Sequence, residues 1–172
     1  MSLRKALLSF IFILFINPLH AQNTPTPPPE TSQFDFWVGE WIAEWETPEG
    51  EKQYGSNSIA KILDGFVIEE NFNGNPAMPF LGKSHSVYSV AKRKWLQTWV
   101  DNNGGYLDFE GEFENDKMIL SRSFTSPKGS KIHQRMIFYN ISENEFDWNW
   151  ELSTDDGKTF NLSWKIHYSR KK

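Results

Sequence analysis

The clearest pattern along this chain is an alternation of apolar and polar residues, and it is strongest in the last third of the sequence. Every second residue is apolar in two stretches: Phe146, Trp148, Trp150 and Leu152, then Phe160, Leu162, Trp164, Ile166 and Tyr168. Residues 107–113 repeat the pattern. Successive side chains of a β-strand point to opposite faces. The alternation therefore predicts strands with one buried face and one face in water.

Turn signals divide the chain at regular intervals between residues 48 and 157. They are short groups rich in Gly, Asn, Asp and Pro, such as residues 102–105 (NNGG) and 155–157 (DDG). Such residues preset a turn or tolerate positive φ. The segments between them are roughly 7–12 residues long and make about nine or ten strands. No long apolar stripe of helical period follows residue 21, and residues 31–37 fit one short helical turn.

Short connections require neighbouring strands to be antiparallel, because parallel neighbours need a long crossover. Many sequential antiparallel strands remove their exposed edges by closing on themselves. We therefore expect an all-β fold, a closed antiparallel up-and-down barrel of about 9–10 strands. A sandwich of two sheets is the alternative architecture. A barrel of this strand number has room inside for one small ligand.

The first 21 residues read as a secretory signal peptide. Arg4 and Lys5 precede an apolar run at residues 6–16, and residues 19–21 (LHA) resemble a cleavage site with small residues. The run is shorter than the roughly 20 residues that span a membrane. We expect cleavage near Ala21, a secreted or periplasmic location and no stable membrane anchor after cleavage. Residues 22–33 are rich in Pro and Thr and predict a solvated linker, which leaves residues 34–172 as the barrel domain.

Composition excludes several kinds of chemistry. The chain has no cysteine, so it forms no disulfides and has no thiol catalysis or thiolate metal site. Its net charge of −4 at pH 7 argues against nucleic acid as a partner. The histidines outside the signal lack the spacing of a zinc site, so we expect neither a metal nor another cofactor. Aromatic residues are frequent, with 8 Trp, 5 Tyr and 14 Phe.

The barrel domain opens with residues 34–41 (FDFWVGEW), in which Gly39-x-Trp41 resembles the Gly-x-Trp signature of lipocalin and calycin barrels. In those families the Trp plugs the closed end of the barrel, and a basic residue from near the last strand packs across it. The resemblance implies these roles for Gly39, Trp41 and Arg170, with Lys165 as the alternative basic residue. The physical reason is that a wide aromatic ring fills a barrel end, and a guanidinium can lie flat on an indole.

Two further segments widen the resemblance. They are residues 63–66 (LDGF) and residues 95–102 (WLQTWVDN), the second leading to Gly104-Gly105. Together with the opening motif, they are similar to an uncharacterised family of bacterial proteins, many of them secreted, with a lipocalin-like barrel. That family is a domain of unknown function, so the resemblance supports the fold far more than a function.

The strand at residues 95–101 is the best candidate for a ligand-binding wall. Trp95, Gln97, Trp99 and Asp101 share one face of it, although the sequence favours a turn-capping role for Asp101 over a role in the pocket. Glu70 lies on the apolar face of residues 66–72, where its charge needs a partner, and Arg122 is the expected one. Such a pair could orient a polar ligand group or be purely structural. The candidate ligand-binding residues are Glu70, Trp95, Gln97, Trp99, Arg122, Trp148 and Trp150.

The main functional hypothesis is binding of a small hydrophobic or amphipathic molecule, without catalysis. One alternative is an isomerase or cyclase that uses Glu70 or Asp101 as general acid or base. Another is a haem protein that binds iron through His167, although the phase of His167 places it on the wet face. The last is a solid barrel whose aromatic residues simply fill the interior.

Overall fold

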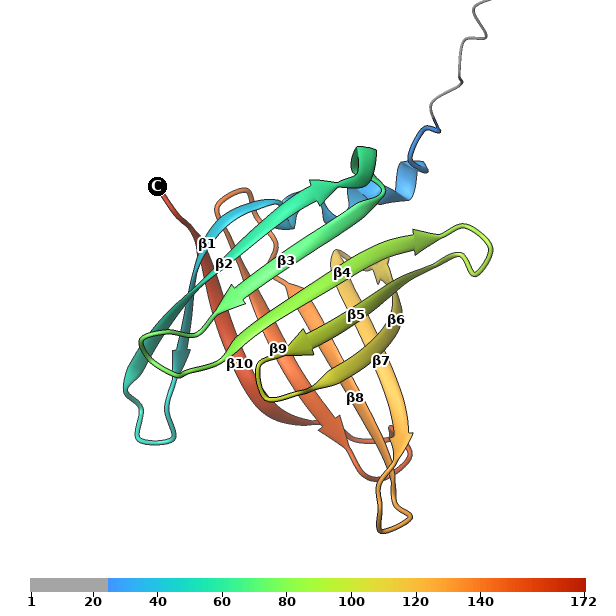
Figure 1. Cartoon of the computed structure of the whole chain (residues 1–172). Helices are drawn as coiled ribbons and strands as arrows, with labels where there is room; N and C mark the ends of the chain where they lie inside the picture. The colour runs from blue at the N-terminus through green and yellow to red at the C-terminus, as the bar shows by residue number, and fades with distance from the viewer. Residues whose placement is uncertain (1–24) are drawn as a thin grey trace, which may run out of the picture.

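Ten antiparallel strands form a closed barrel in the computed structural model, which describes residues 25–172 (Figure 1). Each strand pairs with the strands before and after it in sequence, and the last pairs with the first. This confirms the predicted closed up-and-down barrel. The strands are β1 (Gly39–Glu46), β2 (Lys52–Ile62), β3 (Val67–Asn73), β4 (Leu81–Ser89), β5 (Lys94–Asp101), β6 (Tyr106–Glu114), β7 (Lys117–Thr125), β8 (Lys131–Tyr139), β9 (Glu145–Ser153) and β10 (Asn161–Arg170).

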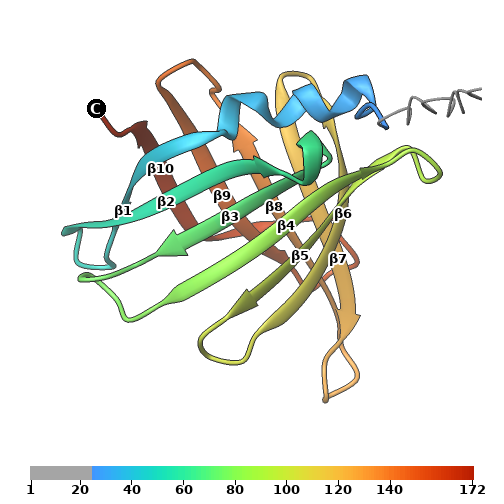
Figure 2. The same ribbon diagram turned by 45° about the horizontal axis from the view of Figure 1, so that its top comes forward.

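Two short 3₁₀-helices accompany the strands, η1 (Pro29–Trp37) and η2 (Leu63–Gly65). Helix η1 lies across one end of the barrel, as Figure 2 shows. It begins before residue 34, the predicted start of the domain, because Thr31 is buried and its Oγ1 donates a hydrogen bond of 2.7 Å to the carbonyl of Pro28. Residues 29–33 therefore belong to the folded domain and not to the linker.

The predicted signal peptide and its cleavage site lie outside the described residues. Within residues 25–172, neither helix is long and apolar enough to cross a membrane.

Strands β1 and β10 close the barrel, with Trp41 paired to Arg170 and Ala43 to Tyr168. Trp41 is fully buried, and its Nε1 donates a hydrogen bond of 2.7 Å to the carbonyl of Trp37 in η1. The Arg170 guanidinium lies over the Trp41 ring, 4.2 Å from the centroid. A Cβ at position 39 would overlap that guanidinium, so Gly39 makes room for it. The structure thus gathers the three residues of the expected plug at the closed end.

Arg170 also ties the closed end together through its hydrogen bonds. Its Nη1 donates to the carbonyl of Val38 at 3.0 Å and its Nε to the carbonyl of Glu143 at 2.8 Å. These bonds join β10 to the segment before β1 and to the β8–β9 loop. The loops at residues 74–80 and 102–105 lie at the opposite end of the barrel, where β3 and β5 finish.

One part of the predicted alternation is wrong. The β9–β10 register shifts between Leu162 and Trp164. A bulge adds one unpaired residue and so reverses the faces of the residues before it. Leu162 is therefore 56% exposed instead of buried, and Phe160 stacks under the guanidinium of Arg135, 3.8 Å from its ring centroid. Trp164, Ile166 and Tyr168, which follow the bulge, point inward as predicted.

Candidate functional site

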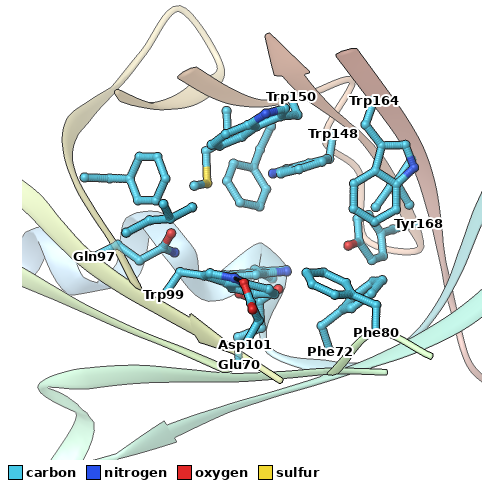
Figure 3. A pocket seen from close by; sticks show the side chains of 16 residues that line it. Glu70, Phe72, Phe80, Gln97, Trp99, Asp101, Trp148, Trp150, Trp164 and Tyr168 are labelled. Atoms are coloured by element: carbon cyan, nitrogen blue, oxygen red, sulfur yellow. Dashed lines mark hydrogen bonds between the residues drawn. The ribbon is translucent and has the colours of Figure 1, made fainter. Parts of the chain in front are cut away.

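A cavity of about 250 Å³ lies inside the barrel, between the aromatic residues under η1 and the opposite end (Figure 3). Its wall is mostly aromatic. Ten aromatic side chains line it: Trp37, Phe72, Phe80, Trp99, Phe109, Phe138, Trp148, Trp150, Trp164 and Tyr168. Three aliphatic residues complete the apolar wall, Leu107, Met136 and Ile166. The polar lining residues are Glu70, Gln97 and Asp101.

The indoles of β9 and β10 form one side of the cavity. Trp148 and Trp150 are stacked, with centroids 6.3 Å apart and planes 16° apart. Trp164 meets Trp148 edge to face at 5.8 Å. Figure 3 shows Trp99 and Glu70 across the open space from this group. The alternation within β9 and β10 produces this arrangement, because residues two apart in a strand share a face.

Glu70 is the buried polar group of the site, with 7% of its surface exposed. Its Oε1 accepts a hydrogen bond of 2.7 Å from Asn57 Nδ2, and its Oε2 accepts one of 2.6 Å from Ser84 Oγ. Burial raises the pKa of Glu70 above its ordinary value of 4.5, although both hydrogen bonds oppose the rise. The Glu70 carboxyl therefore keeps its proton at pH values where an exposed glutamate has lost it.

The expected pair between Glu70 and Arg122 does not form. Arg122 Nη1 donates to Gln134 Oε1 at 3.1 Å, and its guanidinium lies 4.9 Å from the ring centroid of Phe124. The ladder between β6 and β7 covers only Glu110–Glu114 and Lys117–Ser121. Arg122 follows Ser121, the last residue of β7 that pairs with β6, and is itself paired with Gln134 of β8. The alternation along the strand predicted that Arg122 points inward, but alternation does not give the position of a residue along the barrel axis or its neighbours on other strands. Arg122 does not line the cavity.

Trp95 has the predicted inward phase but lies at the closed end, under η1. It is 1% exposed, and its Nε1 donates to Gln33 Oε1 at 2.9 Å. Four residues along a strand span roughly 13 Å. Trp95 and Trp99 therefore occupy opposite ends of the same wall. Gln97 lies between them, lines the cavity and donates from Nε2 to Ser86 Oγ at 2.9 Å.

The structure thus brings five of the seven candidate residues together around one cavity: Glu70, Gln97, Trp99, Trp148 and Trp150. Sequence reasoning missed Asn57 and Ser84, which hold the Glu70 carboxyl. Both lie in polar stretches without alternation, so the sequence gives no signal for their inward orientation. Trp164 and Tyr168 carried a signal, since both belong to the inward phase of the last strand.

Asp101 has both of the roles considered for it. Its Oδ1 accepts hydrogen bonds of 2.9 Å from the backbone N–H groups of Asn103 and Gly105, which caps the β5–β6 turn. Its Oδ2 accepts one of 3.0 Å from Trp99 Nε1, and the residue lines the cavity. The hydrogen bond from Gly105 is the largest cause that lowers the pKa of Asp101. Asp101 therefore remains ionised at neutral pH.

His167 does not face the cavity. Its side chain is 43% exposed, and its Nδ1 lies 3.0 Å from Asp147 Oδ1 on the outer wall. The outward orientation of His167 therefore does not support its role as a haem ligand. Among residues 25–172, no three His, Asp or Glu side chains are grouped as a metal site would require.

Glu70→Gln is expected to change how stability depends on pH. Folding raises the pKa of this carboxyl above its ordinary value of 4.5, and the protonated carboxyl therefore stabilises the folded state at low pH. This stabilisation is lost as the pH rises from 4.5 through the pKa of the folded state. The wild type should therefore lose stability over that window, and the glutamine variant should lack this loss. Urea unfolding at several values between about pH 4 and pH 8 measures it.

Glu69→Gln is the matched control, because Glu69 is the adjacent residue and its pKa is lowered by hydrogen bonds from Asn71 and His85. The lowered pKa of Glu69 stabilises the folded state at pH values above its ordinary pKa, and this stabilisation is lost as the pH falls. The pH dependence that Glu69 contributes is therefore opposite in sign to that of Glu70. Parallel pH profiles for wild type and Glu70→Gln would show that Glu70 does not titrate in this way.

Comparison with known proteins gives a family and no activity. A family model described as "Protein of unknown function (DUF1579)" matches residues 26–170. No curated protein matches the chain. Among solved structures, a redesigned β-barrel is similar, with a TM-score of 0.35 and 11% identity over 86% of this chain and 100% of that one. The resemblance drawn from the sequence is confirmed, since this chain belongs to DUF1579, a family of proteins of unknown function.

Proposed function

We propose that this protein binds a small hydrophobic or amphipathic molecule inside its barrel. The observation that carries the proposal is the cavity of about 250 Å³, whose wall is aromatic apart from three aliphatic and three polar residues. Small-molecule sites have this character, being mostly apolar with a few placed polar groups, and their volumes run to about 300–1,000 Å³. The cavity, at about 250 Å³, is slightly smaller than this range, and its size therefore favours a compact ligand over a long lipid chain.

The space itself supports a binding protein over a solid structural barrel. A barrel whose aromatic residues only filled the interior would leave little room, since protein interiors are close-packed. Burying apolar ligand surface here contributes roughly 25 cal/mol for each Å² removed from water. Gln97 and Glu70, on the inner faces of β5 and β3, are placed to orient one polar group of the ligand.

Access to the cavity is expected from the end opposite η1. Trp41, Phe34 and Trp95 are fully or almost fully buried and fill the closed end. Phe80 lies in the loop before β4, next to Trp99, with ring centroids 6.0 Å apart. We propose that these two rings flank the route of the ligand. We also propose that the protein is exported, which rests on the N-terminal sequence alone.

Titration with small neutral aromatic compounds, such as naphthalene and indole, tests the proposal. We expect a saturable change in tryptophan emission, because several indoles line the cavity. Trp150→Ala should weaken binding about tenfold, in keeping with aromatic contacts of about 0.5–1.5 kcal/mol plus lost apolar surface.

Tyr54→Ala is the control for this titration, because Tyr54 is 47% exposed and does not line the cavity. It should leave the affinity unchanged. A flat emission response of the wild type across a broad panel of compounds, with no heat of binding by calorimetry, would rule the proposal out.

A further inference from the structure

We propose that the ligand is an organic cation, a small amine or quaternary ammonium compound held among the indole rings with Glu70 and Asp101 as its counter-charges. This inference rests on the proposed function and names the chemical class of the ligand. Three properties of the cavity carry it: the sign of its charged groups, the kind of aromatic ring in its wall and the position of Glu70.

The charged groups of the cavity are all acidic. Glu70 and Asp101 are the lining residues that can carry a charge at neutral pH, and the lining contains no Lys, Arg or His. The guanidinium of Arg122 lies behind the lining ring of Phe109, 5.8 Å from its centroid, and its acidic neighbour is Asp108, at 3.7 Å. A carboxylate or phosphate ligand would lie near the ionised Asp101 in an apolar space whose lining supplies no positive charge, and such a buried charge is costly. The cavity therefore disfavours anionic ligands such as fatty acids.

The aromatic wall favours a positive charge over a neutral apolar group. Aliphatic side chains serve an uncharged ligand well, yet this wall has only three of them beside four half-buried indoles, Trp99, Trp148, Trp150 and Trp164. The ring face of tryptophan carries the strongest negative electrostatic potential of the aromatic side chains, and cages of such rings recognise quaternary ammonium groups. Figure 3 shows Trp148, Trp150 and Trp164 gathered on one side of the open space.

Glu70 completes the site as a buried acceptor across from these rings. Each of its oxygens already accepts one hydrogen bond, from Asn57 and from Ser84. A carboxylate oxygen has capacity for a second, so an ammonium N–H can still be bound. The position of Glu70 is fixed before the ligand arrives, because both partners come from neighbouring strands. Preorganisation of this kind reduces the cost of binding.

Binding of a permanent cation is expected to become tighter as pH rises. Burial raises the pKa of Glu70, so the carboxyl must lose its proton before it can act as the counter-charge of a bound cation. The free-energy cost of this deprotonation falls as the pH rises, and binding becomes tighter. Tyr168 of β10 is the titratable group that faces Glu70, and burial raises its own pKa well above 10.0, so it stays neutral. Asn57 of β2 and Ser84 of β4 do not titrate. Asp101 is ionised throughout, because its pKa is lowered.

The decisive experiment compares two probes of equal shape, phenyltrimethylammonium and tert-butylbenzene, by tryptophan emission and calorimetry on the wild-type protein. They differ in charge alone. We expect the cation to bind at least tenfold more tightly than its neutral counterpart, and the anion 4-tert-butylbenzoate to bind most weakly. Glu70→Gln should reduce the cation's advantage to about threefold or less and remove its pH dependence, while the neutral probe keeps its affinity.

Glu69→Gln is the control, since Glu69 lies on the outer face of the same strand and should leave both affinities unchanged. Equal or tighter binding of tert-butylbenzene by the wild type overturns the charge inference and leaves the proposed function standing. Failure of all three probes and of the neutral aromatic panel overturns both. The wild-type comparison needs no variant, so it decides the matter even if Glu70→Gln does not fold.

Discussion

Replacing Trp41 by alanine is expected to lower the free energy of unfolding by about 3–5 kcal/mol, the usual cost of removing a large aromatic ring from a core. Trp41 is 0% exposed and meets Phe146 edge to face, with centroids 4.9 Å apart. The substitution also removes the indole N–H that binds the Trp37 carbonyl and the ring beneath Arg170. The closed end would lose its central side chain while the surrounding strands, joined by their ladders, could not collapse to fill the space.

Urea unfolding measures this loss as a lower midpoint with an unchanged slope. Tyr106→Ala is the matched control, because Tyr106 is 65% exposed on β6 and substitutions at such sites usually change stability by about 0.5 kcal/mol or less. If Trp41→Ala costs no more than this control, the closed end is not held by its tryptophan.

Gly111→Ala is expected to have the second largest effect on stability, a loss of about 1–3 kcal/mol or more, as overpacking of a core does. A Cβ on Gly111 would overlap the carbonyl oxygen of Ile119 and approach the Cα of Leu120 to 2.8 Å. Both atoms belong to the backbone of β7, which cannot rotate aside as a side chain can. Relief requires separating β6 from β7, whose ladder is already short.

Gly82→Ala provides the comparison, because the three atoms nearest to its Cβ would all belong to the indole of Trp99. A side chain can move, so this variant should lose less stability than Gly111→Ala. It should instead alter the affinity for small neutral aromatic compounds, since Trp99 lines the cavity. A larger loss of stability for Gly82→Ala, with unchanged affinity, would contradict this account.

The architecture could be predicted from the sequence because two local signals agree along most of the chain. Alternation marked the strands, and the short turns between them required antiparallel neighbours. The prediction was wrong where one residue broke the period. The bulge before Trp164 turned Leu162 and Phe160 outward, and a bulge leaves no clear mark in a sequence whose apolar residues keep alternating.

The site was harder to predict because phase gives the face of a side chain and not its height in the barrel. Trp95 and Trp99 share a face, yet one lies under η1 and the other beside the cavity. The partners of Glu70 depend on the register of β3 against β2 and β4, which places Ser84 opposite it. Register is a property of the closed sheet, so Asn57 and Ser84 could not be assigned from their own neighbourhood in the sequence.

The tryptophans near the cavity also have an optical consequence. Trp148 lies 6.3 Å from Trp150 and 5.8 Å from Trp164, and Trp164 lies 5.7 Å from Trp45. At such separations the transition dipoles of neighbouring indoles couple, and excitation energy passes among the rings faster than any one of them radiates. These four chromophores therefore act as one antenna. A molecule that quenches a single member darkens the whole group, far beyond the share of light that this ring would emit alone.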